Sequence, residues 1–187
     1  MIKISNYVAL LALFMLSTAG FAATKAEKQE NVRETTQKTL ERLYKAQPQA
    51  KDAIAKAAGY AVFSNFGMKI FVAGGGSGSG MAVNTKTKQE TFMKMVEVQA
   101  GLGFGVKKFR LVWVFETAGK LNEFISKGWE LGAQATASAQ MSGQGSEVYA
   151  GAMSVSPGIW LYQLTDDGLA VELTAKGTKY YKDASLN

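Results

Sequence analysis

The pattern of hydrophobic and polar residues changes near residue 60. Before that point the apolar positions from Val32 to Tyr44 recur at the spacing of a helix, and the opposite face is charged. Thr24 and Glu27 have the spacing of a capping box, with the threonine as N-cap. Pro48 interrupts the pattern, because proline lacks the N–H that a helix interior needs. The pattern therefore predicts a helix that begins after Thr24 and ends before Pro48.

Two shorter segments are also expected to be helical. Residues 49–58 are rich in alanine, and Gly59 stands where a glycine that ends a helix belongs. Residues 118–127 place Leu121, Phe124 and Ile125 on one side, and a glycine follows. We therefore predict a second helix in the N-terminal part and one internal helix.

From residue 60 onward the apolar residues follow the two-residue period of strands. The clearest case is residues 107–115, where Phe109, Leu111, Trp113 and Phe115 share one face. Strands are predicted at residues 60–63, 68–73, 81–83, 91–98, 107–115, 129–140, 148–155, 159–164 and 169–174. Between the last two, an Asp-Gly pair at residues 167–168 indicates a tight hairpin. No strand is predicted in the basic, aromatic tail that begins at Lys176.

Glycine recurs at every second position in two stretches, residues 74–80 and 101–105. A phosphate-binding P-loop requires a lysine after its last glycine, but Met81 occupies that position, and dinucleotide fingerprints use a different spacing. Period two instead places the glycines on one face of a strand, where another backbone can approach or the sheet can bend. A groove lined by backbone amides is the alternative. The fold class predicted is α+β: N-terminal helices followed by a curved, glycine-rich, mainly antiparallel β-sheet, partly closed and barrel-like, with one packed internal helix.

The first 22 residues have the layout of a secretory signal peptide. A basic start precedes an apolar run at residues 7–16, and small residues follow, with Gly20 and Ala22 at the −3 and −1 positions of a cleavage site. The run is too short to cross a membrane. The chain has no cysteine, so a lipoprotein and disulfides are both excluded. We expect a periplasmic or secreted protein whose residues 23–187 form a single domain, with a helical segment at about residues 24–58.

Charge and composition narrow the classes of function. The formal net charge is +6, which favours anionic partners, although it can also serve solubility alone. Export makes nucleic acid the least favoured anion. The absence of histidine excludes histidine-based catalysis and the usual zinc sites. We therefore expect no catalytic activity and no cofactor. The alternative is an enzyme that uses a carboxylate pair such as Glu116 and Glu130.

The candidate anion-binding residues cluster in the strand region. Lys108 and Arg110 are two residues apart on a predicted strand, so both side chains leave the same face, which suits a phosphate group near a membrane surface. The full predicted set is Lys69, Lys94, Lys107, Lys108 and Arg110. A second basic run contains Lys176, Lys179 and Lys182. The alternative is a solvated sheet face, or an edge strand that its lysines protect from aggregation.

Five segments of the chain, in their order and spacing, resemble the SYLF domain family. They are residues 58–63 (AGYAVF), the glycine run at 74–80, residues 99–103 (QAGLG), residues 128–133 (GWELGA) and residues 173–179 (LTAKGTK). The resemblance covers about residues 40–182. It implies a lipid-binding domain, since eukaryotic members bind phosphoinositides through basic residues and an amphipathic N-terminal helix, and some yeast members bind actin. In a bacterial envelope the implied ligand is an anionic phospholipid head group.

Two questions stay open at this point. The apolar stripe of the N-terminal helix is narrow, which favours packing on the domain's own core over deep insertion into lipid. Peripheral binding of anionic lipid competes with a structural or scaffolding role in the cell envelope that acts through a protein partner.

Overall fold

The computed structural model describes residues 23–70, 73–100, 105–131, 147–165, 168–170 and 177–187. Within these ranges it describes no side chains for residues 65–70, 73–74, 98–100, 105–108, 131 and 168–170. The helices are α2 (Lys25–Ala46), α3 (Gln49–Lys56) and α4 (Ala118–Lys127), with a 3₁₀ turn η1 (Glu147–Tyr149). The strands are β1 (Gly59–Ile70), β2 (Ala73–Asn84), β3 (Glu90–Ala100), β4 (Gly105–Phe115), β5 (Trp129–Leu131), β6 (Met153–Ser156), β7 (Ile159–Thr165), β8 (Gly168–Ala170) and β9 (Thr178–Lys182).

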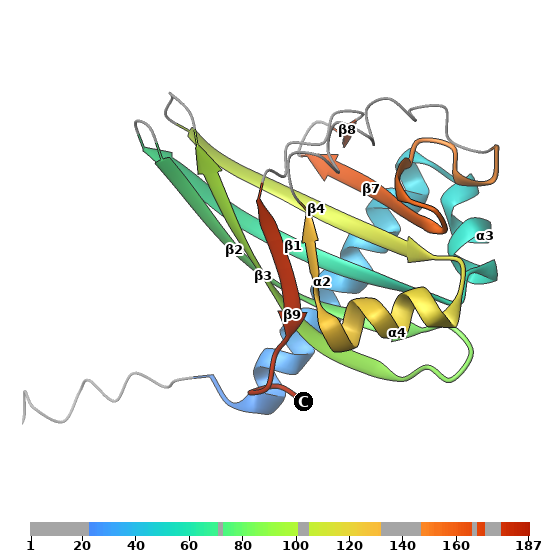
Figure 1. Cartoon of the computed structure of the whole chain (residues 1–187), viewed down its shortest axis with the longest axis horizontal. Coiled ribbons are helices and arrows are strands. Elements are labelled where there is room, and N and C mark those ends of the chain that lie inside the picture. The colour runs from blue at the N-terminus through green and yellow to red at the C-terminus, as the bar shows by residue number, and fades with distance from the viewer. Residues whose placement is uncertain (1–22, 71–72, 101–104, 132–146, 166–167, 171–176) are drawn as a thin grey trace, which may run out of the picture.

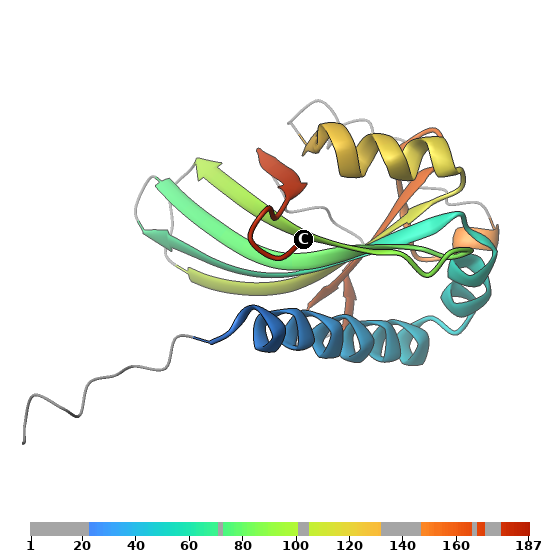
Figure 2. The same ribbon diagram turned by 90° about the horizontal axis from the view of Figure 1, so that it is seen from below.

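The strands form one curved antiparallel sheet in the order β5-β9-β3-β2-β1-β4-β7-β6, with β8 paired to β7. Helix α2 runs along one face of the sheet and α4 lies over the other (Figures 1 and 2). The predicted α+β class with a curved antiparallel sheet is confirmed. Below, the two sides are called the α2 face and the α4 face.

Each face of the sheet has its own hydrophobic core, because successive side chains of a strand point to opposite sides. On the α4 face, Phe63 and Trp113 pack against Phe124 of α4, with ring centroids 6.2 and 5.5 Å apart. On the α2 face, Val62 and Tyr162 belong to a cluster with Leu43 of α2. The sheet is therefore covered on both sides where these helices lie.

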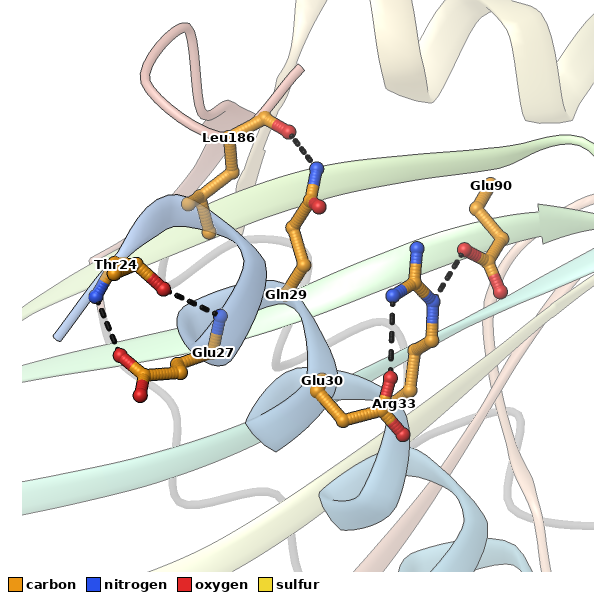
Figure 3. A network of polar contacts seen from close by, with 7 residues as sticks. All are labelled: Thr24, Glu27, Gln29, Glu30, Arg33, Glu90 and Leu186. Atoms are coloured by element: carbon orange, nitrogen blue, oxygen red, sulfur yellow. Dashed lines mark hydrogen bonds and ion pairs between the residues drawn. The ribbon is translucent and has the colours of Figure 1, made fainter.

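The N-terminal helix docks on the sheet. Its capping box is confirmed, with Thr24 Oγ1 accepting from the Glu27 N–H at 3.2 Å and Glu27 Oε2 accepting from the Thr24 N–H at 2.7 Å. Further along the helix, Arg33 Nε donates to Glu90 of β3 at 2.8 Å, and Gln29 Nε2 donates to a main-chain carbonyl of the tail at 2.7 Å (Figure 3). The apolar stripe of α2 thus packs on the domain's own core.

Two glycines of the run in β2 have no space for a side chain. A Cβ at Gly80 would overlap the carbonyl oxygen of Val62 and the ring of Phe63. A Cβ at Gly78 would lie 2.5 Å from the carbonyl oxygen of Ser64. The structural role predicted for this run agrees with these contacts, since glycine lets the curved β1 and β2 come close together.

Several predicted boundaries are wrong. The predicted second helix ends earlier, with Ala57 as its extended C-cap, and Gly59 begins β1. Residues 148–152 were predicted as strand, but they contain part of η1 and a turn, and β6 begins at Met153. The predicted strands at 60–63 and 68–73 are not separate, because β1 continues without a break to Ile70, and Ala73 already belongs to β2. Predictions at residues 132–140, 167 and 171–174 lie outside the described residues.

Strand β9 was not predicted at all. It pairs with β3 on one side and with β5 on the other, so it lies inside the sheet. Thr178 and Tyr180 alternate with Lys179 and Tyr181 as buried and more exposed positions. The run is only five residues long and basic, so its sequence alone does not predict a strand.

Candidate anion-binding cleft

A row of polar side chains crosses five neighbouring strands on the α2 face. The register places Arg110 of β4 opposite Ser64 of β1, Ser64 opposite Ser79 of β2, and Ser79 opposite Lys94 of β3. Lys94 is in turn opposite Tyr181 of β9. Neighbouring strands lie about 4.8 Å apart, so two cations stand at the ends of a short line of hydroxyl groups.

This row lines an open cleft of about 520 Å³, called the sheet cleft. Its polar lining is Ser64, Ser77, Ser79, Lys94, Arg110 and Tyr181. Val96 adds an apolar side chain that is 37% exposed, one of the few large apolar side chains at the described surface. Met95 and Phe109 also border the cleft, but their buried side chains belong to the core on the α4 face. Hydroxyl groups and a guanidinium donate hydrogen bonds to phosphate oxygens, so the sheet cleft can hold an anionic head group.

Lys94 is held by a buried carboxylate. Its Nζ lies 3.0 Å from Oδ2 of Asp183, and Asp183 is only 4% exposed. Burial alone would raise the pKa of the Asp183 carboxyl, but hydrogen bonds from Ser185 and the ion pair with Lys94 together hold this pKa below its ordinary value. Asp183 therefore stays ionised and fixes the position of the lysine.

A second cleft of about 380 Å³ lies between α2 and the sheet, and it is called the helix cleft. Ser79 and Lys94 line both clefts, so the two adjoin. Asn31 and Thr35 of α2 line the helix cleft from one side. The rest of its lining is Lys28, Val32, Asp183, Ser185 and Leu186. The helix cleft therefore exists because α2 docks on the sheet, and it continues the sheet cleft beneath this helix.

The structure brings together two of the five predicted site residues. Lys94 and Arg110 line the same cleft. The side chains of the other three lie outside the described part of the structure. Their backbones pair between β1 and β4, with Lys69 opposite Gly105, Lys107 opposite Gly67 and Lys108 opposite Phe66. These three stay predictions.

The proposed protection of an edge strand by lysines is wrong for Lys94 and Arg110. Strand β3 pairs with β2 and β9, and β4 pairs with β1 and β7, so both strands lie inside the sheet. The two cations therefore belong to a central part of the α2 face.

The other charged candidates have partners elsewhere. Lys179 of the second basic run forms an ion pair with Glu130 at 2.8 Å, and Lys182 is exposed. The Lys176 position lies outside the described residues. Glu116 accepts a hydrogen bond from Trp160 Nε1 at 2.8 Å. Each member of the Glu116 and Glu130 pair is thus engaged with a different side chain.

Sequence reasoning missed the hydroxyl groups and the tail carboxylate of the site. Ser77 and Ser79 alternate with glycines, and this period places both hydroxyl groups on one face of a strand. The sequence therefore contained a signal for these hydroxyl groups, but the prediction considered only the glycines. Ser64 and Asp183 carried no local signal. Only the strand register brings Ser64 to the sheet cleft, and only the path of the tail brings Asp183 to Lys94.

We expect the Asp183→Asn variant to lose stability in a pH-dependent way. The folded pKa of Asp183 lies below its ordinary value of 3.8, so its ionised form stabilises the fold above that pH, and this contribution is lost as the pH falls through the lower folded pKa. At about pH 7 the variant should be less stable by about 1.5–3 kcal/mol, the range for hydrogen bonds to charged groups. Urea unfolding at several pH values measures the difference.

The exposed Asp52→Asn variant of α3 is the matched control for this experiment. Its difference from the unmodified protein should stay small at every pH. A deficit of Asp183→Asn that does not shrink below about pH 4 would assign its effect to packing and not to charge.

Among the residues that the structure describes, no group of acidic side chains could hold a metal ion. None of the described helices has the length and apolar character needed to cross a membrane.

No family model matches the chain. Over 150 residues it is 30% identical to Beta cell expansion factor A from Aeromonas veronii. The alignment covers 79% of this chain and 54% of that relative, so the chain spans about half the length of the curated relative it matches. Most of the chain is therefore similar to one part of that bacterial protein.

Proposed function

We propose that this chain is an exported member of the SYLF family that binds anionic phospholipid head groups peripherally and has no catalytic activity. The observation that carries the proposal is the sheet cleft, in which Arg110 and Lys94 flank Ser64 and Ser79 on adjacent strands. Hydrogen-bonding hydroxyls beside cations are what a phosphate group requires. The apolar Val96 beside them suits the boundary between head groups and acyl chains.

The five segments that resemble the SYLF family support the assignment to that family. The segment at residues 58–63 leads into β1, the glycine run lies in β2, and the segment that begins at Gly128 leads into β5. The similarity over 150 residues to a relative from Aeromonas veronii fits a bacterial origin. The signal peptide proposed for residues 1–22 would take the domain to the periplasm or outside the cell.

Arg110→Glu is expected to weaken binding to anionic vesicles by about 10- to 30-fold. A basic side chain near an anionic surface contributes about 1 kcal/mol, and reversal adds repulsion of similar size. Binding should also weaken as salt rises, because salt screens exposed charges. Co-sedimentation of residues 23–187 with neutral and anionic vesicles at low and moderate salt measures both effects. Lys108→Glu, two positions along β4, is expected to act in the same direction.

Lys120→Glu is the matched control, because it makes the same change in net charge on α4, over the opposite face of the sheet. It should leave vesicle binding nearly unchanged. Equal weakening by Lys120→Glu and Arg110→Glu would show that only the net charge matters and would remove the sheet cleft from the proposal. The absence of binding to any anionic vesicle at low salt would refute the lipid-binding function and favour a protein partner in the envelope.

A further inference from the structure

Lys94 stands between two partners. It lines the sheet cleft, where the proposed function uses its charge, and it also lines the helix cleft, where its Nζ lies 3.0 Å from Oδ2 of Asp183. Asp183 is 4% exposed and belongs to the lining of the helix cleft, so the ion pair draws the ammonium toward that cleft. An anion in the sheet cleft therefore competes with Asp183 for the same lysine.

Residues 183–187 form a bridge between β3 and α2, which is called the latch. On the side of β3, Oδ1 of Asn187 accepts from the N–H of Phe92 at 3.0 Å, and its Nδ2 donates to the carbonyl of Phe92 at 2.8 Å. On the side of α2, Gln29 and Lys25 donate to main-chain carbonyls of the latch at 2.7 and 2.8 Å, the first of which is drawn in Figure 3. The carboxylate that holds the lysine and the first turns of α2 thus belong to one network of contacts.

The first turns of α2 depend on this network because they bury little apolar surface. The buried residues of α2 begin at Val32, and the described residues of the helix before it are exposed or half-buried. The helix cleft lies between this part of α2 and the sheet. Segments with few buried apolar contacts open at a low cost in free energy. The polar contacts of the latch therefore decide how firmly the first turns of α2 dock.

A second cation limits the strength of this competition. Lys28 of α2 is exposed and lines the helix cleft together with Lys94 and Asp183. When an anion draws Lys94 away, Lys28 still compensates part of the charge of Asp183. The coupling between an anion and the latch is therefore expected to be graded and not all-or-none.

From this arrangement we propose that the latch regulates the anion site: Asp183 competes with an anionic head group for Lys94, so that anion binding and the docking of the first turns of α2 oppose each other. This regulation rests on the proposed function and deepens it. The coupling is reciprocal, because a bound anion that loosens the latch requires that a loosened latch raise the affinity for the anion by the same factor. The closed latch thus keeps the protein in a state of lower affinity.

The test measures binding to phosphatidylcholine vesicles with and without phosphatidylglycerol for two variants that open the latch. Asp183→Asn removes the competing charge and should bind the anionic vesicles about fivefold more tightly, which is the contribution of one lysine near an anionic surface. Asn187→Ala removes the side-chain hydrogen bonds to Phe92 without a change in charge. By the same linkage it should strengthen binding by about two- to fivefold.

The controls separate the latch from net charge and from unfolding. Asp52→Asn of α3 and Asn122→Ala of α4 make the same changes at exposed positions and should bind like the unmodified protein. The double variant Lys94→Gln/Asp183→Asn has the net charge of the unmodified protein and should bind no more tightly than it, because the lysine to be released is absent. A gain that persists in the double variant would overturn the regulation, and thermal melting shows whether each variant is folded.

Amide hydrogen exchange reports the opening of the latch directly. In Asn187→Ala the amides of residues 29–33 should exchange faster, whereas those of residues 36–46 and of the paired strands β1 and β2 should keep their protection. An equal increase in all of these segments would mean that Asn187 supports the whole fold, and it would overturn the role of the latch.

The outcomes separate the regulation from the lipid-binding function. Binding of the unmodified protein without a gain in either latch variant would overturn the regulation and leave the lipid-binding function standing. Binding by the two latch variants alone would support both, with the unmodified protein held in its closed state. Absence of binding to anionic vesicles by every variant would refute the lipid-binding function and the regulation with it.

Discussion

Gly80→Ala is expected to lower the free energy of unfolding by about 3 kcal/mol, which is a large fraction of the roughly 5–15 kcal/mol that stabilises a folded domain. The added Cβ would overlap the carbonyl oxygen of Val62 and the ring of Phe63. A backbone carbonyl in a paired strand cannot move aside without breaking the β1–β2 ladder, and Phe63 is fully buried. Urea unfolding followed by tryptophan fluorescence measures the loss.

Gly75→Ala is the matched control in the same strand. Its new Cβ would lie 3.6 Å from the nearest atom, the carbonyl oxygen of Glu97, which is an ordinary contact, and the position is exposed. We expect a change within about 1 kcal/mol, since alanine also restricts the unfolded chain. If both variants lose the same stability, the cause is strand propensity and not the close approach of β1 at Gly80.

The second large effect is expected for Phe124→Ala. Phe124 is fully buried, and its ring centroid lies 4.9 Å from that of Phe115, 5.5 Å from Trp113 and 5.6 Å from Tyr180. Phe124 therefore packs α4 against the aromatic core of the α4 face, together with Leu121. Deletion of a buried phenylalanine side chain costs about 3–5 kcal/mol through lost burial and the remaining cavity.

Near-UV circular dichroism and urea unfolding measure this effect together, because the rings around Phe124 also give the near-UV signal. Phe124→Leu should cost clearly less, since it leaves a smaller cavity. Asn122→Ala tests the helix alone at an exposed position and should be nearly neutral. Similar losses for Asn122→Ala and Phe124→Ala would mean that helix formation, and not ring packing, limits stability.

The parts of the fold that were predicted well are governed by local chemistry. The capping box of Thr24 and Glu27 requires only residues three apart, and α2 begins where it indicates. The helix at Ala118–Lys127 and the strand to Phe115 follow their hydrophobic periods, and Gly128 ends α4 at a φ of 75°. Such signals depend on neighbours in the chain, which the sequence displays directly.

The errors occurred where a distant partner decides the structure. The five residues of β9 become a strand because β3 and β5 supply hydrogen bonds on both sides, and Tyr180 is buried there against Trp113. Isolated from that sheet, a short basic segment cannot hold an extended conformation. The early end of the second helix has the same origin, since Gly59 pairs with both β2 and β4.

By itself, the sequence determined the positive charge, the helical start, the strand-rich body and the presence of cations such as Lys94 and Arg110. Only the tertiary structure decided that these two cations meet Ser64 and Ser79 in one cleft and that Asp183 holds the lysine. The physical reason is register. A strand shows in its own sequence which side chains share a face, but which residue of the next strand lies opposite depends on the packing of the whole sheet.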